Sequence, residues 1–196
     1  MLPTLATLLL AGCGATAKSA KVEMAPAPKQ TYAGAEVSPP RAAQPIALHD
    51  AWGRPVSLRT LRGRYVLVTF LYVHCPDVCP LIAQNLNAAL RQLGPRRSRV
   101  RVLAVSVDPK GDTAAAVKRF IAQRGLLPQF RYLIGTKPQL APVWAAWHVI
   151  AVAAPGVVNH VAYTALVDPA GKERVLYDSK VKASQVLHDL RLLMSA

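Results

Sequence analysis

Two almost wholly apolar runs, separated by a helical pattern, constrain the fold of this chain most. Residues 65–73 (YVLVTFLYV) and 100–107 (VRVLAVSV) are rich in β-branched and aromatic residues. Apolar runs of this length without alternation are typical of central strands that are covered on both faces. Between them, LIAQNLNAALRQL places Leu81, Leu86, Leu90 and Leu93 near one face of a helix, which Gly94-Pro95 ends. Buried strands that alternate with helices predict an α/β fold.

The remaining periodic segments continue this alternation. We expect an entry hairpin over 46–58 that turns at Trp52-Gly53, a helix over 113–124 capped by Asp112 and ended by Gly125, a short strand at 131–134, a helix over 138–147, a hairpin within 162–177 and a final helix over 184–194. This order predicts a thioredoxin-like fold, with a central mixed β-sheet flanked by helices and an N-terminal β-hairpin.

The first 44 residues lack this periodicity. Residues 5–11 form an apolar run that is too short to span a bilayer but fits an export signal. The tetrapeptide LAGC that ends at Cys13 resembles a bacterial lipobox, in which the cysteine is acylated, and such an anchor would hold the protein at the extracytoplasmic face of the bacterial cell membrane. We therefore expect a lipoprotein signal peptide over 1–12, a lipid-anchored flexible Ala/Pro linker over 13–44 and one domain over 45–196.

The net charge is strongly positive, at +14 from 24 basic and 10 acidic residues. The stretch RQLGPRRSRVR could suit a nucleic-acid partner, but an export signal would remove the chain from nucleic acid. The basic residues also lie between or outside the apolar stripes. We expect no nucleic-acid partner, and a solvated basic surface attracted to anionic lipid or to an acidic partner domain.

The segment HCPDVCP at residues 74–80 carries two cysteines, Cys75 and Cys79, where the first central strand gives way to a helix. Open α/β sheets gather ligands at this end of their strands. The positive helix N-terminus should favour the thiolate form, which both redox chemistry and metal binding need. A disulfide between them would close too small a loop to constrain the unfolded chain much. A reversible redox pair and a metal site remain open, because the spacing alone does not separate them.

His160 is the histidine most suited to join the cysteines. It comes directly before the strand expected beside the cysteine strand, so its imidazole can reach the same end of the sheet. We expect His49 and His188 to face solvent, His148 to be packed, and His74 to support the cysteines or face a partner.

Two carboxylates accompany the cysteines in the sequence. Asp77, between them, is an auxiliary candidate that would tune the sulfurs by hydrogen bonding, although carboxylates at helix starts commonly serve as caps. Asp108, at the end of the second central strand, is interpreted as structural.

Three motifs together resemble the Sco (SenC) family of membrane-tethered copper chaperones over residues 45–196: FLYVHCPDVCP, VLAVSVDPKGDT and NHVAYTALVDPAGK. The family's C-P-x-x-C-P element falls on residues 75–80, and its copper-binding histidine, before a strand ending in D-P-x-G, falls on His160. The resemblance implies a copper ion bound by Cys75, Cys79 and His160. It also implies delivery of copper to, or preparation of the thiols of, the dinuclear copper site of cytochrome c oxidase. The implied partners are its subunit II or another cuproprotein, and a thiol–disulfide reductant.

The donor chemistry is compatible with copper, since soft Cu(I) prefers thiolates and imidazole suits both oxidation states. Zinc could also use two cysteines and a histidine. The alternative to a metallochaperone is a membrane-tethered thiol–disulfide oxidoreductase that uses the cysteine pair alone. Thioredoxin-like oxidoreductases carry a cis-proline where this chain has Asn159-His160-Val161. We therefore expect a metal-delivering protein rather than an enzyme, with thiol–disulfide exchange as a side activity.

Overall fold

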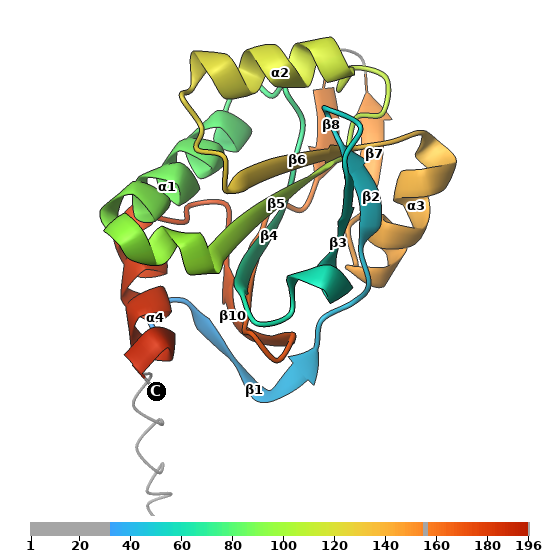
Figure 1. The fold of residues 1–196 in the computed structure, drawn as a ribbon. Helices are drawn as coiled ribbons and strands as arrows, with labels where there is room; N and C mark the ends of the chain where they lie inside the picture. Colours follow the sequence, from blue (N-terminus) through green and yellow to red (C-terminus); the bar gives the residue numbers. More distant parts are fainter. Residues whose placement is uncertain (1–31, 155–156, 196) are drawn as a thin grey trace, which may run out of the picture.

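The computed structural model describes residues 32–154 and 157–195 (Figure 1). The predicted signal peptide and Cys13 lie outside these residues. The strands are β1 (Ala35–Ala42), β2 (Ala47–Asp50), β3 (Pro55–Ser57), β4 (Tyr65–Leu71), β5 (Val100–Ser106), β6 (Phe130–Ile134), β7 (Ala151–Ala154), β8 (Val157–His160), β9 (Thr164–Val167) and β10 (Lys172–Tyr177). The helices are η1 (Leu58–Leu61), α1 (Val78–Gln92), η2 (Gly94–Arg99), α2 (Ala114–Gln123), α3 (Lys137–Ala146) and α4 (Ala183–Ser195), of which η1 and η2 are 3₁₀ helices.

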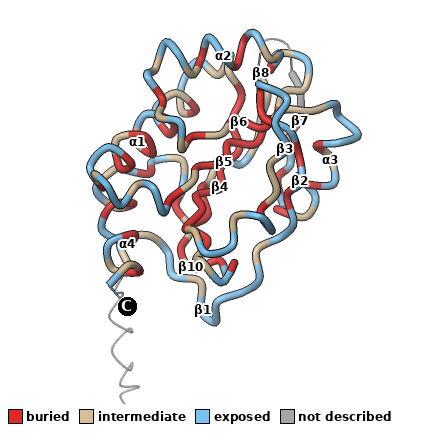
Figure 2. Tube along the Cα trace, viewed as in Figure 1, coloured by how far each residue is buried: buried red, intermediate tan, exposed pale blue. Residues whose placement is uncertain are grey.

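Eight strands form one mixed sheet in the order β1-β10-β9-β4-β5-β6-β2-β3. Strands β4, β5 and β6 run parallel at its centre, and the remaining neighbours pair antiparallel. All seven residues of β4 are buried, as its unbroken apolar sequence predicts, and the buried residues concentrate in the central strands (Figure 2). The α/β class, the mixed sheet flanked by helices and the N-terminal hairpin of β2 and β3 are confirmed.

Helices cover the sheet from both sides. Helices α1 and α4 lie side by side, while α3 lies across the sheet from them (Figure 1). Leu86 and Leu90 of α1 are fully buried, as predicted, but Leu81 is 53% exposed. The buried face of the helix begins instead with Cys79 and Ile82, so Leu81 lies off that face. Within the described residues, no helix has the length and apolar content that crossing a bilayer requires.

Strand β1 corrects the predicted extent of the linker. Residues 35–42, expected to belong to the flexible segment 13–44, pair antiparallel with β10 at the edge of the sheet. Most β1 side chains are exposed, so little apolar periodicity marks the strand in the sequence. Its two prolines, Pro39 and Pro40, are tolerated because an edge strand needs to donate hydrogen bonds on one side only.

Two further predictions about single residues are wrong. Helix α2 is capped by Thr113, whose hydroxyl accepts the Ala116 N–H, and not by Asp112, which is buried. His148 is exposed rather than packed, because it follows the end of α3 with a left-handed φ of 55°.

Candidate metal centre

The cysteine turn connects the carboxyl end of β4 to the start of α1. The Cys75 N–H donates to the Tyr72 carbonyl at 3.3 Å, which closes the turn. Cys79 is the second residue of α1, and its N–H donates to the Cys75 sulfur at 3.4 Å. This N–H belongs to the first turn of α1, where it has no partner within the helix, and it points at the sulfur, as the sequence predicts. Both cysteines are free thiols in the structure.

The two sulfurs have different surroundings. Cys75 is half-buried, whereas Cys79 has no exposed surface. Burial raises the pKa of the Cys79 thiol well above its usual range, and the neighbouring Cys75 raises it further. The expectation of a favoured thiolate is therefore wrong for Cys79, because desolvation outweighs the helix terminus there. The Cys79 thiol is therefore protonated at neutral pH, and a bound metal ion would have to displace that proton.

His160 comes from a separate two-stranded sheet that the sequence analysis did not predict. It is the last residue of β8 and pairs with Ala151 of β7. The strand that follows, β9, lies beside β4, as predicted, and pairs with it antiparallel. In the sequence, Pro155-Gly156 between two apolar stretches is a turn signal that could have indicated this hairpin.

The structure brings His160 and Cys79 together. The His160 Nε2 atom lies 4.0 Å from the Cys79 Sγ atom. Burial lowers the pKa of His160, so the ring is neutral at physiological pH and keeps a lone pair for a metal. Metal bonds of about 2.3 Å to sulfur and about 2.0 Å to imidazole nitrogen add up to about 4.3 Å. Both atoms can therefore reach the same ion from where they lie.

The donor set is open. No group of three or more His, Cys, Asp or Glu side chains is already spaced to enclose a metal ion in the described part of the chain. Cys79 and His160 form the close pair, and the Cys75 sulfur lies at the Cys79 amide. Two sulfurs and one neutral nitrogen suit a soft or borderline metal and leave room for a further ligand.

The structure gives Asp77, the auxiliary candidate, neither a ligand position nor a hydrogen bond to the sulfurs. It stands at the N-cap position of α1, is exposed and makes no side-chain capping hydrogen bond. His74 is exposed as well. The Asp108 carboxylate accepts the N–H groups of Lys110 and Gly111, which agrees with the structural role expected of it. His49 and His188 are exposed, as predicted.

Two residues that the sequence analysis assigned to the core or to a cap support the site. The buried ring of Tyr72 meets the His160 ring edge-on, with centroids 6.0 Å apart. The buried Asp112 carboxylate accepts the Val73 N–H at 2.8 Å and the Tyr132 hydroxyl at 3.1 Å. Asp112 therefore fixes the backbone that leads into the cysteine turn. Their sequence signal is only their position near the ends of β4 and β5.

Comparison with known proteins places these features in a family. The SCO1/SenC family profile matches residues 35–195. The mitochondrial SCO2 homolog of Bos taurus is 31% identical over 159 residues, which are 77% of this chain and 59% of that protein. The chain thus spans about three fifths of the length of this relative.

Two solved structures share the fold. ScoI of Bradyrhizobium japonicum, solved with copper bound, has a TM-score of 0.69 and 29% identity, and the match covers 78% of this chain and 99% of that one. Apo Sco1 of Thermus thermophilus has a TM-score of 0.72 and 30% identity, and the match covers 85% and 99% of the two chains. These relatives confirm the thioredoxin-like fold. From the profile match over nearly all of the described residues, the chain belongs to the SCO1/SenC family.

Proposed function

We propose that this chain is an extracytoplasmic, membrane-tethered copper chaperone that binds copper through Cys75, Cys79 and His160. The observation that carries the proposal is the 4.0 Å approach of the His160 Nε2 atom to the Cys79 Sγ atom, across 81 residues of sequence. A structural disulfide would have no use for this histidine. A copper-bound structure of a relative supports the choice of metal.

We take the proposed recipient of the copper from the family resemblance. The protein delivers copper to, or prepares the thiols of, the dinuclear copper site of cytochrome c oxidase subunit II, or of another cuproprotein. Three protein ligands suit such a transfer, because an incoming thiolate can take the vacant side of the ion before one of the original ligands leaves. A lipid anchor at Cys13 would keep this exchange at the membrane surface.

A thiol–disulfide oxidoreductase is the second candidate, and the difference between the two thiols favours it. Cys75 is half-buried and lies at a helix start, while Cys79 is enclosed, so Cys75 could attack a partner disulfide and Cys79 could resolve the mixed disulfide. His160 has no necessary part in that reaction.

The two functions are separated by His160→Ala in the reduced protein. As a copper chaperone, the parent gains an intense sulfur-to-copper absorption band when Cu(II) is added, and the variant loses it. A parent that binds no copper, together with a variant that keeps full disulfide-reducing activity, would favour the oxidoreductase. The matched control is His49→Ala, which removes an exposed histidine in β2 and should leave the band unchanged.

A further inference from the structure

A second candidate site lies away from the cysteines. A cavity of about 230 Å³ opens between β3, η1 and the starts of β5 and β6. Its lining includes three arginines, Arg54, Arg101 and Arg131, and the hydroxyl-bearing Thr60. Guanidinium groups present paired donors that match the oxygens of phosphate and carboxylate. The charges around this cavity therefore decide whether it could hold an anion.

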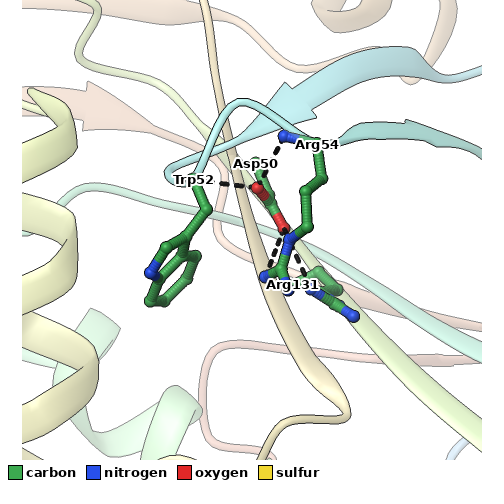
Figure 3. Close-up of polar contacts among 4 residues, drawn as sticks. All are labelled: Asp50, Trp52, Arg54 and Arg131. Carbon is green, nitrogen blue, oxygen red and sulfur yellow. Dashed lines mark hydrogen bonds and ion pairs between the residues drawn. The ribbon is translucent and has the colours of Figure 1, made fainter.

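One carboxylate, Asp50, already serves two of these arginines. It is buried and lies 2.8 Å from Arg54 and 3.0 Å from Arg131 (Figure 3). It also accepts the N–H groups of Trp52 and Arg54. Burial alone would raise the pKa of Asp50, but the hydrogen bonds from Arg54 and Trp52 hold it below its usual value. Asp50 is thus ionised and balances one of the two positive charges.

Arg101 has no carboxylate partner among the described ion pairs. Its guanidinium donates to the carbonyls of Ser98 and Val100. Burial lowers the pKa of Arg101, and the nearby cations Arg64 and Arg131 lower it further. Three guanidinium groups against one carboxylate leave an excess of two positive charges around the cavity. A partly buried cation without a counterion is unfavourable, so an anion bound here would relieve that cost.

The neighbouring cavity is different in character. It measures about 270 Å³ and shares Arg54 and Arg131 with the first, but its other walls are apolar: Trp52, Ile121, Leu126, Leu127, Pro128 and Phe130. Trp52 is 47% exposed although it is large and apolar. A cationic cavity beside an apolar one fits a ligand that is itself amphiphilic.

We propose that Arg54, Arg101 and Arg131 bind the phosphate group of an anionic phospholipid, and that the adjoining apolar cavity takes the hydrocarbon next to that phosphate. A free phosphate offers the same anionic chemistry but has nothing to place in the second cavity. This site is separate from the copper site, so either can fail without the other.

The location of the site would orient the domain. Arg101 is the second residue of β5, whereas the cysteines follow the carboxyl end of the parallel neighbour β4. The arginines and the copper donors thus lie toward opposite ends of the same strands. A headgroup bound at the arginines would leave the copper site facing away from the lipid.

The test uses the full chain carrying Cys13→Ser, so that it is not acylated, and measures binding by titration calorimetry. The probes are dihexanoylphosphatidylglycerol below its micelle concentration, dihexanoylphosphatidylcholine and inorganic phosphate. We expect the phosphatidylglycerol to bind at least about tenfold more tightly than the other two. Phosphate that binds as tightly as the lipid would overturn the assignment to an amphiphile.

Paired variants distinguish lipid binding at the arginine-lined cavity from a general effect of the protein's net charge. The double variant Arg54→Gln/Arg101→Gln should weaken phosphatidylglycerol binding by about tenfold or more. Its control, Arg96→Gln/Arg191→Gln, removes the same charge from exposed positions on η2 and α4 and should change binding by less than about twofold. Equal losses in both would overturn the proposal.

A third variant covers the case in which the arginine variant does not fold. Thr60 is exposed and lines the cationic cavity, so Thr60→Glu adds a negative charge there with little effect on the core. It should weaken phosphatidylglycerol binding to the same extent as the arginine substitutions do. Unchanged binding by a folded Thr60→Glu protein would contradict the site.

Discussion

The two sides of the candidate copper site are held in different ways. Cys75 and Cys79 connect β4, whose residues are all buried, to α1, so the sulfurs are tied to the core of the eight-stranded sheet. His160 ends β8, which pairs with β7 in a two-stranded sheet of its own. Large apolar residues in and beside that hairpin are exposed, among them Val152 at 55% and Val161 at 61%. The sulfurs are therefore tied to the core of the large sheet, while the imidazole is carried by a two-stranded hairpin whose described side chains are half-buried or exposed.

Loss of a sulfur should have the largest effect. Cys75→Ser and Cys79→Ser each remove a soft ligand, so we expect copper affinity to fall by more than the roughly 100-fold that loss of an outer-sphere partner costs. Competition against a copper chelator of known affinity measures this, with Cys13→Ser as the control. Affinity within tenfold of the parent for either site variant would remove that cysteine from the ligand set.

Core and hairpin should differ in their sensitivity to truncation. Leu67→Ala in β4, at a side chain with no exposed surface, should lower the free energy of unfolding by about 2–5 kcal/mol. Val152→Ala in β7, at a side chain that is 55% exposed, should lower it by about 0.5 kcal/mol or less. Denaturant unfolding of both variants checks this. Similar losses at the two positions would show that the hairpin is as much part of the core as β4.

Asp112, which holds the backbone before the cysteine turn, should make the free energy of unfolding depend on pH. Burial raises the pKa of this carboxyl to about 6, from an ordinary value of 3.8. Because folding raises this pKa, the protonated carboxyl contributes its full stabilisation below the pKa of 3.8 that it has in the unfolded chain. That contribution is lost as the pH rises to about 6. The shift corresponds to about 3 kcal/mol, so Asp112→Asn should gain up to that much stability relative to the parent between pH 4 and pH 7. If the free energies of unfolding of the parent and of Asp112→Asn change in parallel with pH, the raised pKa of Asp112 would be contradicted.

Copper binding should release a proton from the enclosed sulfur. The pKa of Cys79 is raised by burial, so its thiol is protonated at neutral pH and must lose that proton to bind metal. Copper affinity should therefore increase with pH, by about tenfold per unit for each proton displaced. Titrations in buffers near pH 6, 7 and 8 measure the slope. Affinity that is flat over this range would show that the sulfur is already a thiolate.

The sequence predicted the parts of the fold that bury apolar surface and missed those that do not. The runs that form β4 and β5, and Leu86 and Leu90 of α1, can be recognised in the sequence because burial in the core requires apolar side chains there. Strand β1 and the β7–β8 hairpin were missed because most β1 side chains are exposed and the hairpin region also exposes apolar residues such as Val152. The meeting of His160 with Cys79 was expected from the strand order, whereas the protonated state of Cys79 was not, because burial by residues distant in sequence decides it.

X-ray absorption spectroscopy at the copper edge of the loaded protein would identify the ligands of the copper ion. We expect two sulfur ligands and one imidazole per copper in the parent, with the imidazole lost in His160→Ala and kept in His49→Ala. A parent spectrum with sulfur ligands only, unchanged by His160→Ala, would contradict a copper site shared by the two cysteines and His160.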